Sequence, residues 1–212
     1  MRPWLPILVS LVLVSCDKGD TGMDYGILEG ELILADGPTA TVVAYKAFGV
    51  DRNGKALLYF TSSESATCAG VAEFLAWGEP TDPTALFSPG HCNVSAVLSV
   101  YDGSEVTINS GEFAVTWNLT CVLGDGAWNW EERGNDDGYY WSGRTWSGGP
   151  DTFTLTVSGG GGDDFVADVE MNDYSGNYIY ESFDNVAASG LVSGTTLVEW
   201  CDDMSETPLL AR

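Results

Sequence analysis

The sequence predicts a single, mostly antiparallel β domain, a β-sandwich or a barrel-like sheet, with one short helix. Glycine makes up 26 of 212 residues, above the usual share of about 7%. Apolar and polar residues alternate along many short segments, as they do in strands with one buried face. Hydrophobic residues are 44% and aromatic residues 12% of the chain, which is enough to build a core and excludes general disorder.

The first predicted strands are apolar segments separated by turn signals. Segments 26–34 and 41–48 flank the turn Ala35-Asp36-Gly37-Pro38. The pair Asn53-Gly54 predicts a tight hairpin turn, after which 55–61 returns as a strand.

One helix is predicted over about 65–77. The apolar residues that recur there at three- and four-residue spacing are Cys68, Val71 and Leu75. Ser63 and Ser65 are candidate N-caps, and Gly78 is expected to end the helix. The proline-rich segment 79–91 is predicted to be a loop.

The remaining chain shows strand alternation almost throughout, for a total of about ten to twelve strands. The clearest example is a face that we expect to be buried, made of Phe113, Val115, Trp117, Leu119 and Cys121. Its opposite face, with Asn118, is expected to meet solvent. Further strands are predicted over 94–100, 152–157, 165–172, 177–183 and 195–200.

The N-terminus has the pattern of an export signal. Arg2 precedes an apolar run over 4–14, which is shorter than the ~20 residues that span a membrane. The run ends in Leu13-Val14-Ser15-Cys16, which resembles the lipobox of bacterial lipoproteins. That resemblance implies cleavage before Cys16, which would then carry a thioether-linked diacylglycerol and an amide-linked third chain, such as palmitate. These chains would anchor the protein to a membrane.

These features divide the chain into a signal peptide over 1–15, a lipidated tether over 16–24, a β domain over 25–207 and a tail over 208–212. The lipobox is followed by a β meander, a cysteine-bearing segment Thr67-Cys68-Ala69-Gly70 and a cysteine just past the last strand, in Glu199-Trp200-Cys201. This layout resembles that of β-rich, disulfide-bearing envelope lipoproteins with unassigned function. The resemblance implies a location in the bacterial cell envelope, facing the periplasm or the exterior, with the choice between inner and outer membrane left open.

The chain is strongly acidic, with 31 acidic and 8 basic residues and a net charge of −23. Nucleic-acid binding depends on basic residues that neutralise phosphates, so a nucleic-acid role is excluded. An acidic surface attracts cations or a basic partner.

Four cysteines remain beside the expected lipidation site, and they are Cys68, Cys92, Cys121 and Cys201. An even number without a Cys-x-x-Cys motif predicts disulfides formed in an oxidising compartment. Three pairings are open. Cys68–Cys92 with Cys121–Cys201 is favoured because its first bridge closes a short loop.

No catalytic residue is predicted. The single histidine, His91, lies in a proline-flanked segment and is interpreted as a loop residue. No Gly-x-Ser-x-Gly nucleophile motif accompanies it, and zinc hydrolases use two or three histidines. The alternative to a non-enzyme is a hydrolase of envelope polysaccharide that uses two carboxylates.

No metal site or cofactor is predicted, and calcium is the alternative. Asp168-x-Glu170-x-Asn172 resembles the start of an EF-hand loop, but Asp173 and Ile179 replace the required glycine and glutamate. These polar residues are interpreted as the solvent-exposed face of a strand. Asp136-Asp137 and Asp163-Asp164 are the other candidate oxygen ligands.

The densest candidate binding surface is aromatic. It consists of Trp128, Trp130, Tyr139, Tyr140, Trp141 and Trp146. If exposed, these rings would stack on sugars, although most such aromatics supply core packing. The sequence therefore predicts a membrane-anchored protein with a non-enzymatic binding or structural role, toward a glycan or a basic partner.

Overall fold

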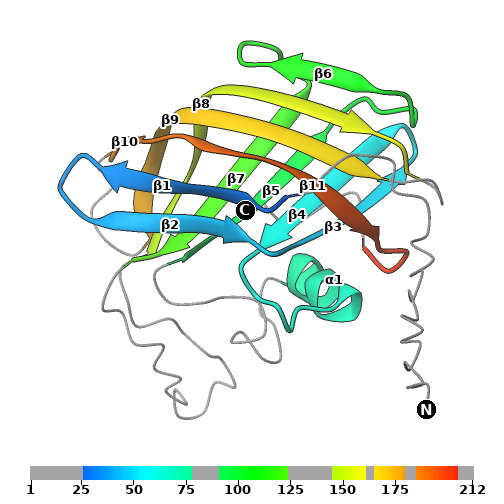
Figure 1. Cartoon of the computed structure of the whole chain (residues 1–212), viewed down its shortest axis with the longest axis horizontal. Coiled ribbons are helices and arrows are strands. Elements are labelled where there is room, and N and C mark those ends of the chain that lie inside the picture. The colour runs from blue at the N-terminus through cyan, green and yellow to red at the C-terminus, as the bar shows by residue number, and fades with distance from the viewer. Residues whose placement is uncertain (1–25, 78–90, 124–144, 161–164, 180–184, 205–212) are drawn as a thin grey trace, which may run out of the picture.

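The computed structural model describes residues 26–77, 91–123, 145–160, 165–179 and 185–204. In this part of the chain, eleven strands form one sheet, accompanied by one helix (Figure 1). The predicted mostly β fold with one short helix is confirmed. Cys16, the predicted signal peptide and the tether fall outside the described residues.

The elements follow one another along the chain in this order. They are β1 Leu28–Leu34, β2 Thr39–Ala44, β3 Lys46–Arg52, β4 Lys55–Thr61, α1 Cys68–Trp77, β5 His91–Leu98, β6 Val106–Asn109, β7 Val115–Val122, β8 Thr145–Ser158, β9 Val166–Ile179, β10 Ala188–Ser189 and β11 Val192–Trp200.

The sheet closes on itself and is therefore barrel-like. Its strand order is β2-β1-β10-β9-β11-β3-β4-β5-β7-β8-β6, and β9 also pairs with β8. That extra pairing turns β9, β11, β3, β4, β5, β7 and β8 into a ring. Most pairings are antiparallel, whereas β11 pairs with β3 and β2 pairs with β5 in parallel.

Alternating side chains divide the ring into an interior and an outer surface. On β5 the interior residues are Cys92, Val94, Ala96 and Leu98, all at most 1% exposed. They pack with residues from most of the other strands in one large apolar cluster. The intervening residues of each strand point outward, as expected for a period of two.

The helix α1 covers part of the outer surface (Figure 1). Val71 and Leu75 pack there against Phe48 and Tyr59, separately from the interior cluster. The helix begins at Cys68, and Thr67 caps it because its hydroxyl accepts a hydrogen bond from the Gly70 amide at 3.2 Å. The predicted caps, Ser63 and Ser65, are therefore replaced by Thr67.

Both disulfides exist, but the favoured pairing was wrong. The bridges are Cys68–Cys201 and Cys92–Cys121. Cys92 and Cys121 are direct partners across β5 and β7, so strand register joins them inside the sheet. Cys68 meets Cys201 because parallel pairing with β3 carries the end of β11 to the base of α1. Loop length was a poor guide because sheet pairing determines which cysteines meet.

The predicted hairpin turn is confirmed. Asn53 and Gly54 both have positive φ, 54° and 75°, as a tight two-residue hairpin turn requires. The pair Arg52 and Lys55 closes the β3–β4 ladder beside them.

Several strand boundaries differ from the predictions. The predicted strand 41–48 breaks at Tyr45, because Ala44 and Ala47 both point inward and a straight strand cannot bury both. His91 begins β5 rather than ending a loop. Phe113, predicted to be buried, lies before β7 and is fully exposed.

The predicted strands 165–172 and 177–183 are parts of one longer strand, β9, as far as Ile179. Asp173 adopts a positive φ of 46°. At that point the buried side chains change from odd to even positions, because Met171 and then Tyr174 point inward. The strand therefore continues through residues 173–176, which the predictions left between two separate strands.

Tyr101 links the β5–β6 connection to the end of β8. The Tyr101 hydroxyl donates a hydrogen bond of 2.5 Å to the Gly159 carbonyl, and the residue is 3% exposed. Burial, with the nearby carboxylates of Asp51 and Asp102, raises the pKa of Tyr101 to about 12.

We expect this tyrosine to make the protein lose stability at alkaline pH. An unfolded tyrosine has a pKa of about 10, so between about pH 10 and 12 the unfolded state releases its proton first and the free energy of unfolding falls. Below that range both states stay protonated and the contribution is constant. Denaturant unfolding across pH should show a shallower alkaline decline for Tyr101→Phe. An identical decline in both proteins would contradict this assignment.

Candidate functional site

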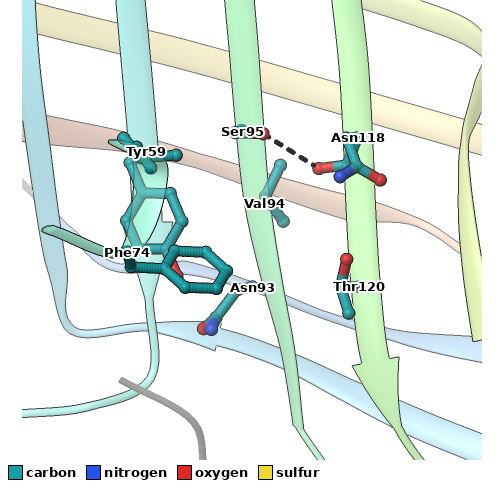
Figure 2. Close-up of a pocket in the computed structure, with 8 residues that line it drawn as sticks. Tyr59, Phe74, Asn93, Val94, Ser95, Asn118 and Thr120 are labelled. Atoms are coloured by element: carbon teal, nitrogen blue, oxygen red, sulfur yellow. Dashed lines mark hydrogen bonds between the residues drawn. The ribbon is translucent and has the colours of Figure 1, made fainter. Parts of the chain in front are cut away.

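A pocket of about 70 Å³ lies between α1 and the outer surface of β4, β5 and β7 (Figure 2). Its lining residues are Tyr59, Phe74, Leu75, Asn93, Val94, Ser95, Asn118 and Thr120. No residue in this lining is charged, and five of the eight carry a hydroxyl or a side-chain amide.

Strand alternation places the polar side chains together. Because Cys92, Val94 and Ala96 face the interior of the sheet, Asn93 and Ser95 point outward, yet both are only 4% exposed. Their partners across β7 are Thr120 and Asn118. Two adjacent cross-strand pairs therefore form a polar floor on the outer surface.

Hydrogen bonds hold this floor in place. The Ser95 hydroxyl donates to the Asn118 backbone carbonyl at 3.5 Å, as the dashed line in Figure 2 shows. The Ser147 hydroxyl on β8 donates to Asn118 Oδ1 at 3.0 Å. This second bond sets the orientation of the Asn118 amide, so the donor and acceptor positions on the floor are preorganised.

Two aromatic rings form the wall of the pocket. Tyr59 extends from β4, in register with Ser95, and Phe74 extends from α1. Their ring centroids are 6.0 Å apart and the rings are tilted by 59°, with Asn93 close by in Figure 2. Aromatic faces beside amides and hydroxyls suit a ligand that has both C–H surfaces and hydroxyl groups.

The Tyr59 hydroxyl is the most unusual group of the pocket. Tyr59 is 2% exposed, and its hydroxyl makes no hydrogen bond of good geometry with the described residues. Burial raises the pKa of Tyr59 far above its ordinary value, and the Asn93 side chain partly offsets that rise. Leaving a buried hydroxyl unpaired costs free energy. A ligand that forms a hydrogen bond with this neutral phenol would therefore gain binding free energy.

The size of the pocket limits what enters it. A pocket of about 70 Å³ is well below the ~300–1,000 Å³ of a typical small-molecule site, so it holds only a small group. It accepts a hydroxymethyl or acetamido group, or one edge of a sugar ring, and leaves the rest of a larger molecule outside.

A second, more open depression of about 250 Å³ lies where β1, β8, β9 and β10 meet. Asp151 and Asp173 both line it, and Asp151 accepts a 2.7 Å hydrogen bond from the Ser175 hydroxyl. It brings together two carboxylates, the groups that a glycosidase needs.

The predicted aromatic surface is tested at one residue. Trp146 is fully buried, and its indole Nε1–H donates to the Val186 carbonyl at 2.9 Å. It belongs to the core, so its prediction as a ligand-binding residue is corrected. The other five aromatic candidates, Trp128, Trp130, Tyr139, Tyr140 and Trp141, fall outside the described residues.

Some of the calcium candidates also lie within the described residues and others outside them. Asp168 and Glu170 lie on the exposed face of β9, where Asp168 accepts a 2.7 Å hydrogen bond from the Thr195 hydroxyl. Within the described ranges, no three His, Cys, Asp or Glu side chains are grouped to hold a metal ion. Asp136-Asp137 and Asp163-Asp164 fall outside these ranges.

The pocket was missed by sequence reasoning, which assigned the Asn118 face of β7 to solvent. No family model matches this chain, and no curated protein or solved structure shows significant similarity to it. In the part of the chain that the structure describes, no helix is both long enough and apolar enough to cross a membrane.

Proposed function

We propose that this protein is a lipid-anchored envelope protein that binds, without turning it over, a neutral hydroxyl-bearing group such as the end of a glycan. The observation that carries the proposal is the pocket under α1, in which uncharged amides and hydroxyls face two aromatic rings. Buried hydrogen-bonding groups confer specificity because a ligand that leaves them unpaired binds poorly.

The chemistry of the lining favours binding over catalysis. Ser95 and Thr120 are hydroxyls without a base among the lining residues. Tyr59 is protonated at physiological pH like an ordinary tyrosine, and burial raises its pKa further instead of activating it. Nucleophilic catalysis needs an adjacent base or a lowered pKa. The two disulfides support an oxidising location, as the lipobox resemblance of Cys16 also does.

The test is calorimetric titration of the full chain with glucose, N-acetylglucosamine and their short oligomers. We expect Tyr59→Phe to weaken binding about tenfold, the value of one hydrogen bond of ~1.4 kcal/mol. The same substitution should leave the stability of the free protein unchanged or raise it, because the Tyr59 hydroxyl lacks a well-formed bond there. A purely structural role of Tyr59 predicts instead that Tyr59→Phe lowers the stability of the free protein and leaves ligand binding unchanged.

Asn93→Ala should also weaken binding, by about three- to tenfold. Asn109→Ala is the matched control because Asn109 is an exposed asparagine on the distant strand β6. Binding that survives both pocket substitutions, or that falls equally with Asn109→Ala, would contradict the proposal.

The second candidate is the carboxylate-based hydrolase, for which Asp151 and Asp173, lining the same depression, would supply the two carboxylates. Incubation with the same oligomers separates the two functions. Turnover that disappears in Asp151→Asn would establish the hydrolase, whereas binding without product formation supports the proposed role.

A further inference from the structure

Exposed aliphatic side chains gather on one part of the outer surface. Among the described residues, seven large hydrophobic side chains are exposed, and four of them lie on or beside β1 and β11. They are Ile27, Ile33, Leu191 and Leu197, with exposed fractions of 37%, 47%, 53% and 48%. Single exposed apolar residues are ordinary, but a group on neighbouring strands indicates an interaction surface.

The strand register places these side chains around acidic ones. Glu29 pairs with Ser193 across β1 and β11, and continuing that register sets Glu31 beside Leu191. Ile33 is the next residue of β1 that points outward after Glu31. The result is an outward row in which aliphatic side chains flank two glutamates.

The acidic character continues onto the next strand. Ser193 pairs with Glu170, and Thr195 pairs with Asp168, across β11 and β9. Both carboxylates are exposed. Four carboxylates and four aliphatic side chains therefore share one surface of three neighbouring strands.

Positive charge in the described residues lies elsewhere. The lysines and arginines there are Lys46, Arg52 and Lys55, all on β3 and β4. Lys46 is nearest, next to the Ala47–Val198 pair, but its ammonium donates to the Ala66 carbonyl at 2.9 Å. Arg52 forms an ion pair with Asp202. The four carboxylates have no cationic partner there.

We propose that this surface docks a short cationic, amphipathic segment of a partner protein. The β1–β11 face, as we call it, comprises Ile27, Glu29, Glu31, Ile33, Asp168, Glu170, Leu191 and Leu197. Complementary charge steers such a segment to the face, and its apolar side chains cover the aliphatic ones.

The charge and size of the face exclude other occupants. A second copy of this chain would set the same carboxylates against one another in a symmetric contact. An anionic lipid surface is repelled in the same way. From Ile27 to Ile33 the face is about 20 Å long at ~3.3 Å per residue, and three strands span about 10 Å. That area is well below the ~800 Å² of a standard interface on each partner, so it fits a peptide-sized segment.

The test uses two synthetic peptides and the full chain. One peptide alternates lysine with leucine, and the other alternates lysine with serine. Fluorescence anisotropy should show the lysine–leucine peptide binding at least about tenfold more tightly, with an affinity that falls as salt rises. Equal binding of the two peptides, or none, would overturn the proposal.

Variants then locate the binding site. Leu191→Ser and the pair Glu29→Gln with Glu170→Gln should each weaken binding about tenfold. The matched control, Glu105→Gln with Glu112→Gln, removes the same two charges near β6 and should leave binding unchanged.

Two outcomes of these variants would overturn the docking face. An equal loss in the Glu105 and Glu112 control would mean that only the net charge matters. Self-association of the wild type that Leu191→Ser abolishes would mean that a second copy occupies the face. Tyr59→Phe should leave peptide binding intact, so this inference stands or falls apart from the proposed sugar pocket.

Discussion

Replacing both cysteines of the outer disulfide, in Cys68→Ala with Cys201→Ala, should lower the free energy of unfolding by up to about 5 kcal/mol. The two residues are 133 positions apart, and closing so long a loop removes much conformational entropy from the unfolded chain. The bridge also joins the start of α1 to the residue that follows β11. Its loss should therefore loosen the helix that carries Phe74 and weaken sugar binding as well.

The inner disulfide provides the comparison. Cys92→Ala with Cys121→Ala removes a bridge between residues 29 positions apart, for which the same argument gives about 3.6 kcal/mol. Because it lies inside the sheet, its removal should leave the pocket ligand affinity unchanged in the folded protein. Peptide mapping without reductant checks the pairing directly. Recovery of a Cys68–Cys92 fragment would contradict it.

Trp146→Ala should cost about 3–5 kcal/mol of stability, the range for a large aromatic removed from a core. Trp146 is fully buried, and its loss would also leave the Val186 carbonyl without its indole donor. Trp117→Ala serves as the control, because Trp117 is only partly buried, against Phe153, and should cost less. Denaturant unfolding measures both. A loss below about 1 kcal/mol for Trp146→Ala would show that the core repacks around the gap.

The ring of Trp146 also depends on a glycine across the sheet. A Cβ atom at Gly176 would lie 2.4 Å from the indole and 2.4 Å from the Ser147 carbonyl oxygen. Gly176→Ala should therefore destabilise the protein as Trp146→Ala does, through overlap instead of a cavity. Both substitutions test the same contact from opposite sides.

Local patterns in the chain predicted local structure well. Asn53-Gly54 predicted the β3–β4 hairpin, and the spacing of Val71 and Leu75 predicted α1, because both depend on neighbours within a few residues. The alternation around Leu119 identified the interior face of β7. It did not distinguish Phe113, since alternation shows which side a residue takes but not where the strand begins.

The pocket illustrates what such patterns miss. Asn118 and Ser95 carry the polar signature of a solvent-facing strand side, yet α1 and the neighbouring strands enclose them. Tyr59 and Phe74 come from the consecutive elements β4 and α1, whereas Asn118 comes from β7, much later in the chain. The polar outer side of these strands becomes a pocket only because a helix packs over it.

By itself the sequence determined the mostly β class, the short helix, the acidic surface and the presence of disulfides, because composition and short-range periodicity suffice for these. Only the tertiary structure decided that the sheet closes, that Cys68 joins Cys201 and that the polar pocket exists. The physical reason is that strand order depends on pairings between distant segments, whose loop-closure cost and packing gain are balanced over the whole chain.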